Sequence, residues 1–504
     1  MRCFFLAVLA LGVLTGCSRG KGPAADAPPT LRVAVVTDLE GYLEPCGCTS
    51  NPLGGIDRLA AQVKQLRRDG AQVLLLMAGD TFYDAAPVEA ARVDQANRNA
   101  STLVDILNRL AVAAVLPGHR DLAQPENVLA ALRAKSSFPW LAAEREAGSL
   151  LIQVGDARVA LVGARRGTSK DAIAREVASK RGEADITIVL VDGTRRDASR
   201  AGTVEGVDFV IQGGLDEDTA LPPRKAGHGW VLHAGRQGQG LTVVDVKRKN
   251  GSEPYVDRSE WSRNERVEQL DRQIRELSEK IDGWERSGDV AAADLDPQRR
   301  RLVTLEKQRA SLDAAVSPAE GNVFFANWIE LVKSGPSDPE IEKLMREHDK
   351  AVNEANRSAF ADLEPPPLGP DDIAYVGSAA CSGCHQAAYS WWKNHAHGVA
   401  YLTLQQRHKE YNLDCVGCHV TGYQEPGGST VTHNLEMALA GVGCESCHGP
   451  GAAHAANPEV GVVRDTPEST CVVCHNEEHS DLFDYGEYVK RLVVPGHGLP
   501  VSTR

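Results

Sequence analysis

The last quarter of this 504-residue chain carries the pattern Cys-x-x-Cys-His four times, between Cys381 and His475. This spacing is the attachment signature of c-type haem, in which two thiols bond to the porphyrin edge and the adjacent histidine ligates the iron. Cysteine pairs at this spacing also bind structural zinc, but zinc needs no histidine directly after each pair. The pattern therefore predicts four covalently attached haems. The expected attachment residues are Cys381, Cys384, Cys415, Cys418, Cys444, Cys447, Cys471 and Cys474, and the expected proximal ligands are His385, His419, His448 and His475.

The charge and the cysteine content narrow the class of protein. A formal net charge of −13, with no dense stripe of lysine and arginine, argues against a nucleic-acid partner. Eight of the twelve cysteines belong to the four motifs, so ordinary disulfide arithmetic does not apply. At about 150 residues per domain, the length predicts about three domains. We expect redox proteins as partners, with the donor and the acceptor left open.

The N-terminus has the pattern of an export signal. Arg2 gives a positive start, and the apolar run Phe4–Leu14 is too short to span a membrane comfortably. The run ends in Leu-Thr-Gly-Cys17, which resembles the bacterial lipobox. The resemblance implies a signal peptide over residues 1–16, cleavage before Cys17 and a lipid on its sulfur. The alternative is an ordinary cleaved signal with an incidental cysteine.

The segment after the cleavage site indicates a destination. Residues 17–30 are rich in alanine and proline and predict a flexible tether. Ser18 follows the cysteine, so the aspartate that would retain a lipoprotein at the inner membrane is absent there. We expect an exported bacterial lipoprotein on the periplasmic side, anchored in the outer membrane by its lipid. Export agrees with c-type haem, which is attached outside the cytoplasm.

Residues 31–250 predict an α/β layered domain, because apolar strands alternate with amphipathic helices. Polar residues such as Asp38, Asp80 and His119 follow strand ends, where α/β folds place their sites. The expected strands are Leu31–Thr37, Val73–Met77, Ala111–Leu116, Val159–Val162, Ile186–Val191, Phe209–Ile211, Trp230–Ala234 and Leu241–Val246, and the expected helices are Gly55–Arg68 and Thr102–Leu110.

These strand ends carry a family resemblance. The segments Thr37–Leu43, Gly54–Ile56, Gly79–Asp84 and Pro117–His119 are similar to those of calcineurin-like metallophosphoesterases, in the 5′-nucleotidase branch. The resemblance implies an αββα sandwich in which two metals activate water and clamp a phosphate.

The ligand set that the resemblance implies is only partly present. Asp38 and Asp80 match metal ligands and His119 matches the catalytic histidine, whereas Glu40 stands where the family has histidine and Gly118 where it has asparagine. The later histidine ligands are replaced by segments that contain Asp192 and Asp216, and Asp121 follows His119 by two residues rather than three.

Three interpretations of this domain stay open. A dinuclear hydrolase is disfavoured by the lost ligands. An altered site could hold one divalent metal at Asp38, Glu40, Asp80 and His119, helped by carboxylates such as Asp192 and Asp216. An inert scaffold or binding domain is the favoured interpretation.

A Cys-x-Cys pair, Cys46 and Cys48, lies on the loop after Asp38. The pair could form a redox dithiol, a soft-metal ligand pair or a strained local disulfide. The segment Glu44–Gly47 resembles one found in a group of exported proteins that share the degenerate nucleotidase motif. That resemblance favours thiol redox chemistry over phosphate chemistry.

Residues 255–362 predict a helical spacer. Apolar residues at heptad spacing from Val267 to Trp284 indicate one helix, and Asp296-Pro297 is expected to start a second. We expect an antiparallel hairpin that serves as a spacer arm, with a dimerising coiled coil as the alternative. The segment Asn322–Ala355 is expected to continue as helix, and the proline-rich segment Leu363–Pro370 marks a domain boundary.

Residues 371–504 resemble the cytochrome c-554 family in the segments Cys381–Tyr401, Cys415–Tyr423 and Val442–His454. The resemblance implies a mostly helical, loop-rich domain in which four packed haems replace an apolar core. It also implies that one haem is five-coordinate, which would allow small-molecule chemistry at that iron.

The distal iron ligands come from outside the motifs. Met437 is the only methionine of this domain, so at most one haem can have the Met/His ligation that raises the potential. Histidine on both sides of most irons indicates mainly low potentials. Matching places in the family pattern favour His397, His454 and His497, then His433, with His395, His408 and His479 as further candidates.

These features support one leading hypothesis and two alternatives. The leading hypothesis is an exported, lipid-anchored electron-transfer protein with four haems, whose N-terminal domain is a degenerate phosphoesterase-like scaffold or a redox module. The first alternative is a working phosphoesterase with a cytochrome tail. The second is an oxidoreductase that acts on a small nitrogen or sulfur compound at a five-coordinate haem.

Overall fold

A computed structural model of the 504-residue chain describes residues 30–45, 52–68, 72–142, 144–249, 253–287, 292–313, 321–434, 437–463, 465–476, 479–480, 482–492 and 494–495. Within these ranges no helix combines the length and the apolarity that a bilayer crossing requires. The sites predicted at Cys17, Cys46, Cys48 and His497 lie outside the described residues, and they stay predictions.

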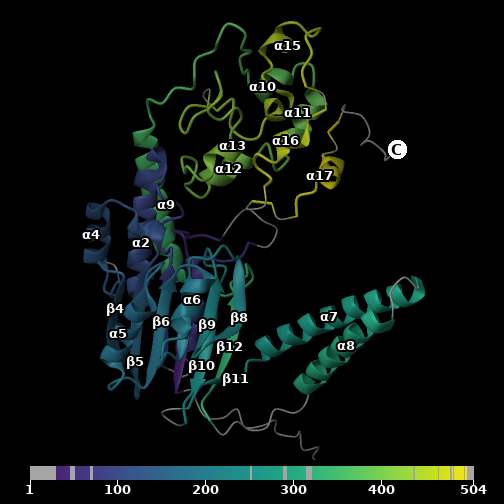
Figure 1. The fold of residues 1–504 in the computed structure, drawn as a ribbon. Helices are drawn as coiled ribbons and strands as arrows, with labels where there is room; N and C mark the ends of the chain where they lie inside the picture. The colour runs from purple at the N-terminus through teal and green to yellow at the C-terminus, as the bar shows by residue number, and fades with distance from the viewer. Residues whose placement is uncertain are drawn as a thin grey trace, which may run out of the picture.

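Two six-stranded sheets form the centre of the N-terminal half (Figure 1). The first has the order β11-β12-β10-β1-β2-β3 and the second the order β4-β5-β6-β7-β9-β8. Strands of the first sheet are β1 (Leu31–Thr37), β2 (Val73–Gly79), β3 (Ala114–Pro117), β10 (Gly240–Lys247), β11 (Val256–Asp257) and β12 (Val323–Glu330). Strands of the second are β4 (Ala147–Val154), β5 (Ala157–Ala164), β6 (Ile186–Asp192), β7 (Phe209–Gly213), β8 (Thr219–Ala226) and β9 (Gly229–Gly235).

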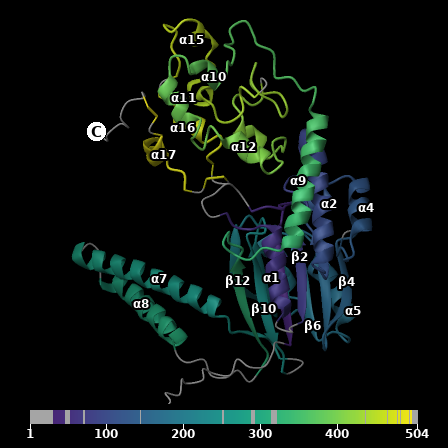
Figure 2. The same ribbon diagram turned by 180° about the vertical axis from the view of Figure 1, so that it is seen from behind.

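The sheets pack on each other through an apolar layer that includes Val33, Leu76, Ile188 and Phe209. Helices cover both outer faces, so that the central strands are buried on two sides and their sequences are mainly apolar. The first sheet is covered by α1 (Ile56–Arg68), α2 (Val93–Arg109), α4 (Glu126–Lys135) and α9 (Pro339–Ala359), and the second by α5 (Lys170–Lys180) and α6 (Arg195–Gly202) (Figure 2). This layering is the αββα sandwich expected from the sequence.

The prediction that Asn322–Ala355 is helical throughout is wrong. Its first part is strand β12, which pairs with β10 along its whole length, from Val323 beside Lys247 to Glu330 beside Gly240. The sandwich therefore continues past the boundary predicted at residue 250 and ends with α9, and the helical hairpin is an insertion between β11 and β12. The apolar residues of this segment fit both the helix period and the strand period. Its pairing with β10, which is distant in sequence, makes it a strand.

The inserted hairpin consists of α7 (Glu260–Ser287) and α8 (Ala292–Asp313) and projects away from the sandwich (Figures 1 and 2). Pro297 lies inside α8 rather than at its start, so the predicted cap is wrong. In α7 the buried residues Leu270 and Ile281 belong to the predicted heptad seam, which faces α8 of the same chain. Dimerisation through this hairpin stays a prediction.

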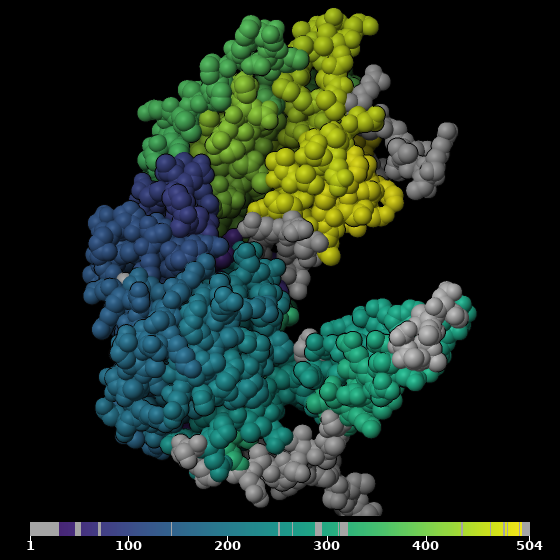
Figure 3. All heavy atoms as spheres, viewed as in Figure 1, coloured from purple at the N-terminus to yellow at the C-terminus, as the bar shows by residue number. Residues whose placement is uncertain are grey.

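The C-terminal part contains short helices joined by loops, and its buried apolar cluster is small, with Tyr401, Val416 and Val420 at its centre. It sits against the N-terminal half in the space-filling view (Figure 3). Its helices are α10 (Ser378–Cys381), α11 (Gln386–Trp392), α12 (Ala400–Gln405), α13 (Val416–His419), α14 (Cys444–His448), α15 (Ala452–Ala456), α16 (Glu468–Cys471) and α17 (Tyr485–Arg491).

Candidate functional site

Each Cys-x-x-Cys-His motif is placed by one short helix. Helices α13 and α14 contain most of the second and third motifs, whereas α10 and α16 end at the first cysteine of the first and fourth motifs. The fold brings the motifs together in pairs, because the thiol of Cys381 contacts that of Cys444 and the thiol of Cys418 contacts that of Cys474. The first motif thus lies beside the third, and the second beside the fourth.

Hydrogen bonds orient several of the histidine rings. The Nδ1 atom of His419 lies 2.8 Å from the Ala400 carbonyl oxygen, that of His448 lies 2.5 Å from the Val463 carbonyl oxygen, and that of His454 lies 2.7 Å from the Val460 carbonyl oxygen. A carbonyl only accepts, so Nδ1 carries the proton in these neutral rings and Nε2 keeps the lone pair that can bind iron. The donor set of this region therefore fits haem.

Two histidines from outside the motifs lie opposite motif histidines. The ring centroids of His385 and His454 are 6.4 Å apart, and those of His397 and His475 are 6.2 Å apart. Burial, reinforced by the neighbouring His395 and His475 rings, lowers the pKa of His397 to about 4. His397 is therefore neutral at physiological pH, which is the form that binds a metal.

The other distal candidates are placed differently. His433 forms a 3.3 Å ion pair with Glu364, and His395 stacks on Trp391 at 4.4 Å between ring centroids. Met437 is 49% exposed. The structure thus pairs His454 and His397 with motif histidines, and it engages His433 elsewhere.

Glu445, between the two cysteines of the third motif, is a structural residue that the sequence analysis missed. It is buried, and its carboxylate accepts hydrogen bonds from the backbone amides of Val376 at 3.0 Å, Gly377 at 2.7 Å and Gly451 at 2.7 Å. These bonds tie the third motif to the segments that flank α10 and α15. The sequence signal that could have identified Glu445 is the presence of an acidic residue between the two cysteines of a haem motif.

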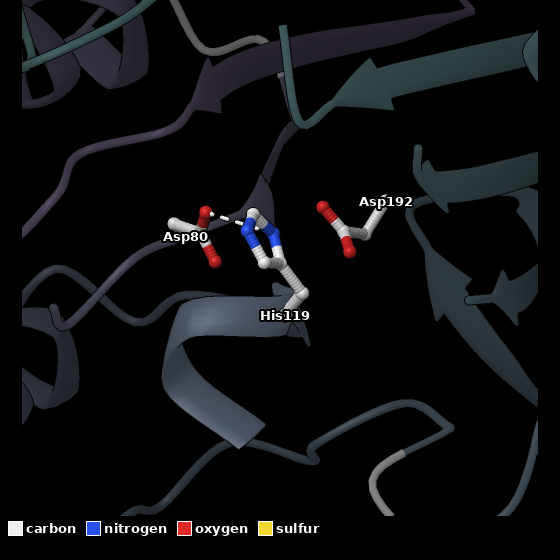
Figure 4. A group of neighbouring side chains, drawn as sticks. All are labelled: Asp80, His119 and Asp192. Atoms are coloured by element: carbon white, nitrogen blue, oxygen red, sulfur yellow. Dashed lines mark ion pairs between the residues drawn. The ribbon is translucent and has the colours of Figure 1, made fainter. Parts of the chain in front are cut away.

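A second cluster of ligand-type side chains lies at the carboxyl ends of β2, β3 and β6, and so draws on both sheets of the sandwich. Ligand atoms of Asp80, His119 and Asp192 all lie within 4.8 Å of one another (Figure 4). His119 Nδ1 is 3.2 Å from Asp80 Oδ2, and its side chain is 47% exposed, whereas Asp80 and Asp192 are buried. The cluster is therefore open to solvent on the histidine side.

The remaining predicted ligands are already engaged. Asp38 accepts hydrogen bonds from the backbone amides of Gly214 at 2.8 Å and Asp80 at 3.1 Å. Glu40 accepts a 2.7 Å bond from Arg120. Asp216, which the sequence offered as another carboxylate, is 84% exposed and pairs with Arg236 at 3.0 Å. The structure brings Asp80, His119 and Asp192 together and leaves Asp216 outside.

The carboxylates of this cluster repel one another in a buried setting. Burial, followed by the charge of Asp80, raises the pKa of Asp192 to about 7. Burial also raises the pKa of Asp38 well above its ordinary value, and it raises that of Asp80. Arg120 partly offsets this effect at Asp80, since its guanidinium lies 3.4 Å away. The raised pKa values follow from the close packing of several buried carboxyl groups.

Asp121 is part of the scaffold. It is fully buried and accepts backbone hydrogen bonds from Thr81 at 2.9 Å, Phe82 at 2.9 Å and Tyr83 at 3.1 Å. These bonds hold the loop that follows β2, and thereby fix Asp80. Asp121, two residues after His119, therefore anchors the loop that follows β2.

A polar interface joins the C-terminal domain to the sandwich. The buried Lys409 ammonium lies 2.7 Å from a carboxylate oxygen of Glu44 and 3.2 Å from one of Asp349. Asp414, directly before Cys415, accepts a 2.6 Å bond from Arg92 and a 2.7 Å bond from Gln95 of α2. The second motif is thus attached directly to the helix layer of the sandwich.

Comparison with known proteins finds a family match within the C-terminal region. Residues 380–449 match the family described as cytochrome c554 and c-prime, and this match covers the first three motifs. The chain is 40% identical over 95 residues to cytochrome c-554 of Nitrosomonas europaea, which covers 16% of this chain and 40% of that protein. Over this segment the region resembles multihaem c-type cytochromes, and the resemblance implies covalently bound haem. The chain spans well under half the length of this curated relative.

Solved structures resemble the N-terminal half at low sequence identity. The 5′-nucleotidase precursor of Thermus thermophilus aligns with a TM-score of 0.43 and 13% identity, over 69% of this chain and 62% of that one. The sulfate thiohydrolase SoxB of the same organism aligns with a TM-score of 0.38 and 17% identity, over 45% and 56%. The calcineurin-like phosphoesterase YfkN of Bacillus subtilis aligns with a TM-score of 0.35 and 15% identity, over 44% and 86%.

Proposed function

We propose that this chain is an exported electron carrier that accepts single electrons from one redox protein and delivers them to another. Four c-type haems, attached at the four motifs, would supply reversible one-electron iron chemistry. The observation that carries the proposal is the pairing of His385 with His454 and of His475 with His397, at 6.4 and 6.2 Å between ring centroids.

These separations fit two imidazoles on opposite sides of one iron. With metal–nitrogen bonds of about 2 Å, the ring centroids of two axial histidines lie about 6 Å apart. An iron held on both sides has no open position for a substrate, which favours carrying electrons over small-molecule catalysis at these two haems. Histidine on both sides also favours low potentials, because Met/His ligation is the arrangement that raises them.

The protein contributes orientation and electrostatics around the iron ligands. The carbonyl bonds to the Nδ1 atoms of His419, His448 and His454 fix the ring tautomer and hold Nε2 toward the interior. The buried Glu445 carboxylate holds the third motif against its neighbours. In this proposal the sandwich is the scaffold that holds the cytochrome domain, and Cys46 with Cys48 would add a dithiol to it.

The proposal places the protein on the periplasmic side, because c-type haem is attached outside the cytoplasm. The lipid anchor predicted at Cys17 is part of it. Fatty-acid labelling of the wild-type chain and of Cys17→Ser checks this part, since the label should be lost only in the variant.

The test of electron carrying combines an iron count with a redox titration of the holoprotein. We expect four irons per chain, low-spin spectra for at least two haems, and a raised potential at one haem in His454→Met. His228→Met is the control, because His228 is exposed, lies in the turn between β8 and β9 of the sandwich and is not among the candidate iron ligands. Unchanged potentials in His454→Met would contradict the axial assignment, and fewer than four irons per chain would contradict haem attachment at all four motifs.

A further inference from the structure

The cluster at the carboxyl edge of the sandwich contains a buried carboxylate oxygen that no donor reaches. Asp192 is only 2% exposed, and its Oδ1 atom has no hydrogen-bond partner. A buried, unpaired carboxylate oxygen is costly, because burial removes its hydration without replacing it. Figure 4 shows this carboxylate pointing toward His119, with the Asp80 carboxylate on the other side of the ring. A cation placed among the three side chains would meet this unsatisfied atom.

Two cations do not fit this site. A Cβ atom on Gly118 would lie 2.1 Å from Asp80 Oδ1 and 2.4 Å from the Asp80 backbone nitrogen, so no side-chain ligand can stand at that position. Arg120 donates a 2.7 Å hydrogen bond to Glu40 and lies 3.4 Å from Asp80. The guanidinium of Arg120 therefore places a permanent positive charge between these two carboxylates. A second metal ion would otherwise have to supply that charge.

We propose that Asp80, His119 and Asp192 bind a single divalent transition-metal ion, and that the guanidinium of Arg120 takes the place of a second cation. Two carboxylates and one imidazole form a borderline donor set, suited to ions such as Zn²⁺ and Mn²⁺. The half-exposed side of His119 leaves the ion open to solvent, so a water or an oxyanion can complete its coordination. This site is independent of the electron-carrying proposal, because none of its residues belongs to a haem motif.

The experiment titrates the holoprotein with Mn²⁺, follows free Mn²⁺ by room-temperature EPR, and then measures displacement by Zn²⁺. The iron concentration of each sample, divided by the number of irons per chain, gives the protein concentration. We expect one equivalent of Mn²⁺ per chain, binding weakened at least about tenfold in Asp192→Asn, and unchanged binding in the exposed control Asp216→Asn. His119→Gln provides a second weakened variant on the exposed side, and the haem spectrum and circular dichroism show that each variant is folded.

The number of equivalents tests the role of the guanidinium. Arg120→Met removes the positive charge while it keeps an unbranched side chain, and we expect a second equivalent of Mn²⁺ to bind. Three results would each overturn the proposal. The wild-type protein could bind two equivalents of Mn²⁺, or it could bind Mn²⁺ no more tightly than Asp192→Asn does. The third result is a single equivalent of Mn²⁺ bound by Arg120→Met. A loss of Mn²⁺ binding with intact haem potentials would leave the electron-carrying function standing.

Discussion

Lys409 is the buried cation of the interface between the cytochrome domain and the sandwich, and replacing it should loosen that interface. Its side chain is 9% exposed, its partner Asp349 is 12% exposed, and its other partner Glu44 is 41% exposed. In Lys409→Met the Asp349 carboxylate stays buried without its counter-ion. Burial already raises the pKa of Asp349 to about 6 against the opposing effect of Lys409, so the loss of the ammonium raises this pKa further.

The magnitude follows from the two partners. Removing one member of a buried pair costs about 3–5 kcal/mol, whereas an exposed pair contributes at most about 1 kcal/mol. Glu44 can regain its hydration and Asp349 can take up a proton, which places the expected loss at the lower end, about 3 kcal/mol. Since about 1.4 kcal/mol is a factor of ten, opening of the interface should become about a hundredfold more frequent.

Hydrogen exchange at two interface amides measures this opening. The Tyr411 amide donates to Asn353 Oδ1 at 2.9 Å and the Leu413 amide donates to Gln95 Oε1 at 3.0 Å, so both are released when the domains separate. Mass spectrometry of the peptide that contains them should show faster exchange in Lys409→Met. Lys343→Met is the matched control, because Lys343 makes only an exposed 3.9 Å pair within α9.

A double variant separates charge from packing. Lys409→Met combined with Asp349→Leu removes both buried charges, and such replacements are often neutral, so exchange should return close to the wild-type rate. Exchange in Lys409→Met that matches the Lys343→Met control would refute the reasoning. A double variant that opens as readily as Lys409→Met would show that the lost contact is steric.

Three further predictions concern single residues. Burial lowers the pKa of His348 from 6.5 to about 4, so its contribution to stability is complete above pH 6.5 and is lost as pH falls toward 4. In denaturant titrations the difference in stability between the wild type and His348→Gln should therefore fall by about 2 kcal/mol from pH 8 to pH 5. Glu445→Gln places an amide group among backbone donors and should destabilise the cytochrome domain by about 1–3 kcal/mol. Thermal unfolding followed at a haem absorption band measures this loss, and Glu468→Gln at an exposed position is the control. Gly118→Ala should destabilise the sandwich by about 1–3 kcal/mol in far-ultraviolet melts, whereas Gly167→Ser, in open space, should be milder.

The local part of the fold could be predicted from the sequence. Strands such as β2 and β6 are mainly apolar, and parallel strands bring their carboxyl ends to one edge, so Asp80 and His119 could be expected to meet there. The haem motifs could be predicted from spacing alone, since the attachment chemistry is confined to five consecutive residues. His454 and His397 needed a family resemblance in addition, because their spacing from any motif carries no chemical constraint.

The parts that could not be predicted depend on contacts between distant residues. Strand β12 joins the sheet after an inserted hairpin, and nothing within its own eight residues distinguishes it from the start of a helix. Arg120 could not be assigned to Glu40 before the loops after β1 and β3 were placed side by side. The sequence showed only that Asp121 departs from the family spacing, and its four backbone amide donors identify it as a loop anchor.

The interface indicates why the two domains are held in one arrangement. Arg92, directly before α2, binds Asp414, the residue before Cys415, and also lies 3.3 Å from Asp84 on the loop that continues from Asp80. A chain of polar contacts therefore runs from the second haem motif to the loop that carries the proposed cation ligand. Buried charges such as Lys409 add little stability, and their documented use is to select one arrangement among several. A fixed geometry between haem motif and cation site is what electron or charge coupling between them would require, whereas two independent modules would need only the proline-rich tether.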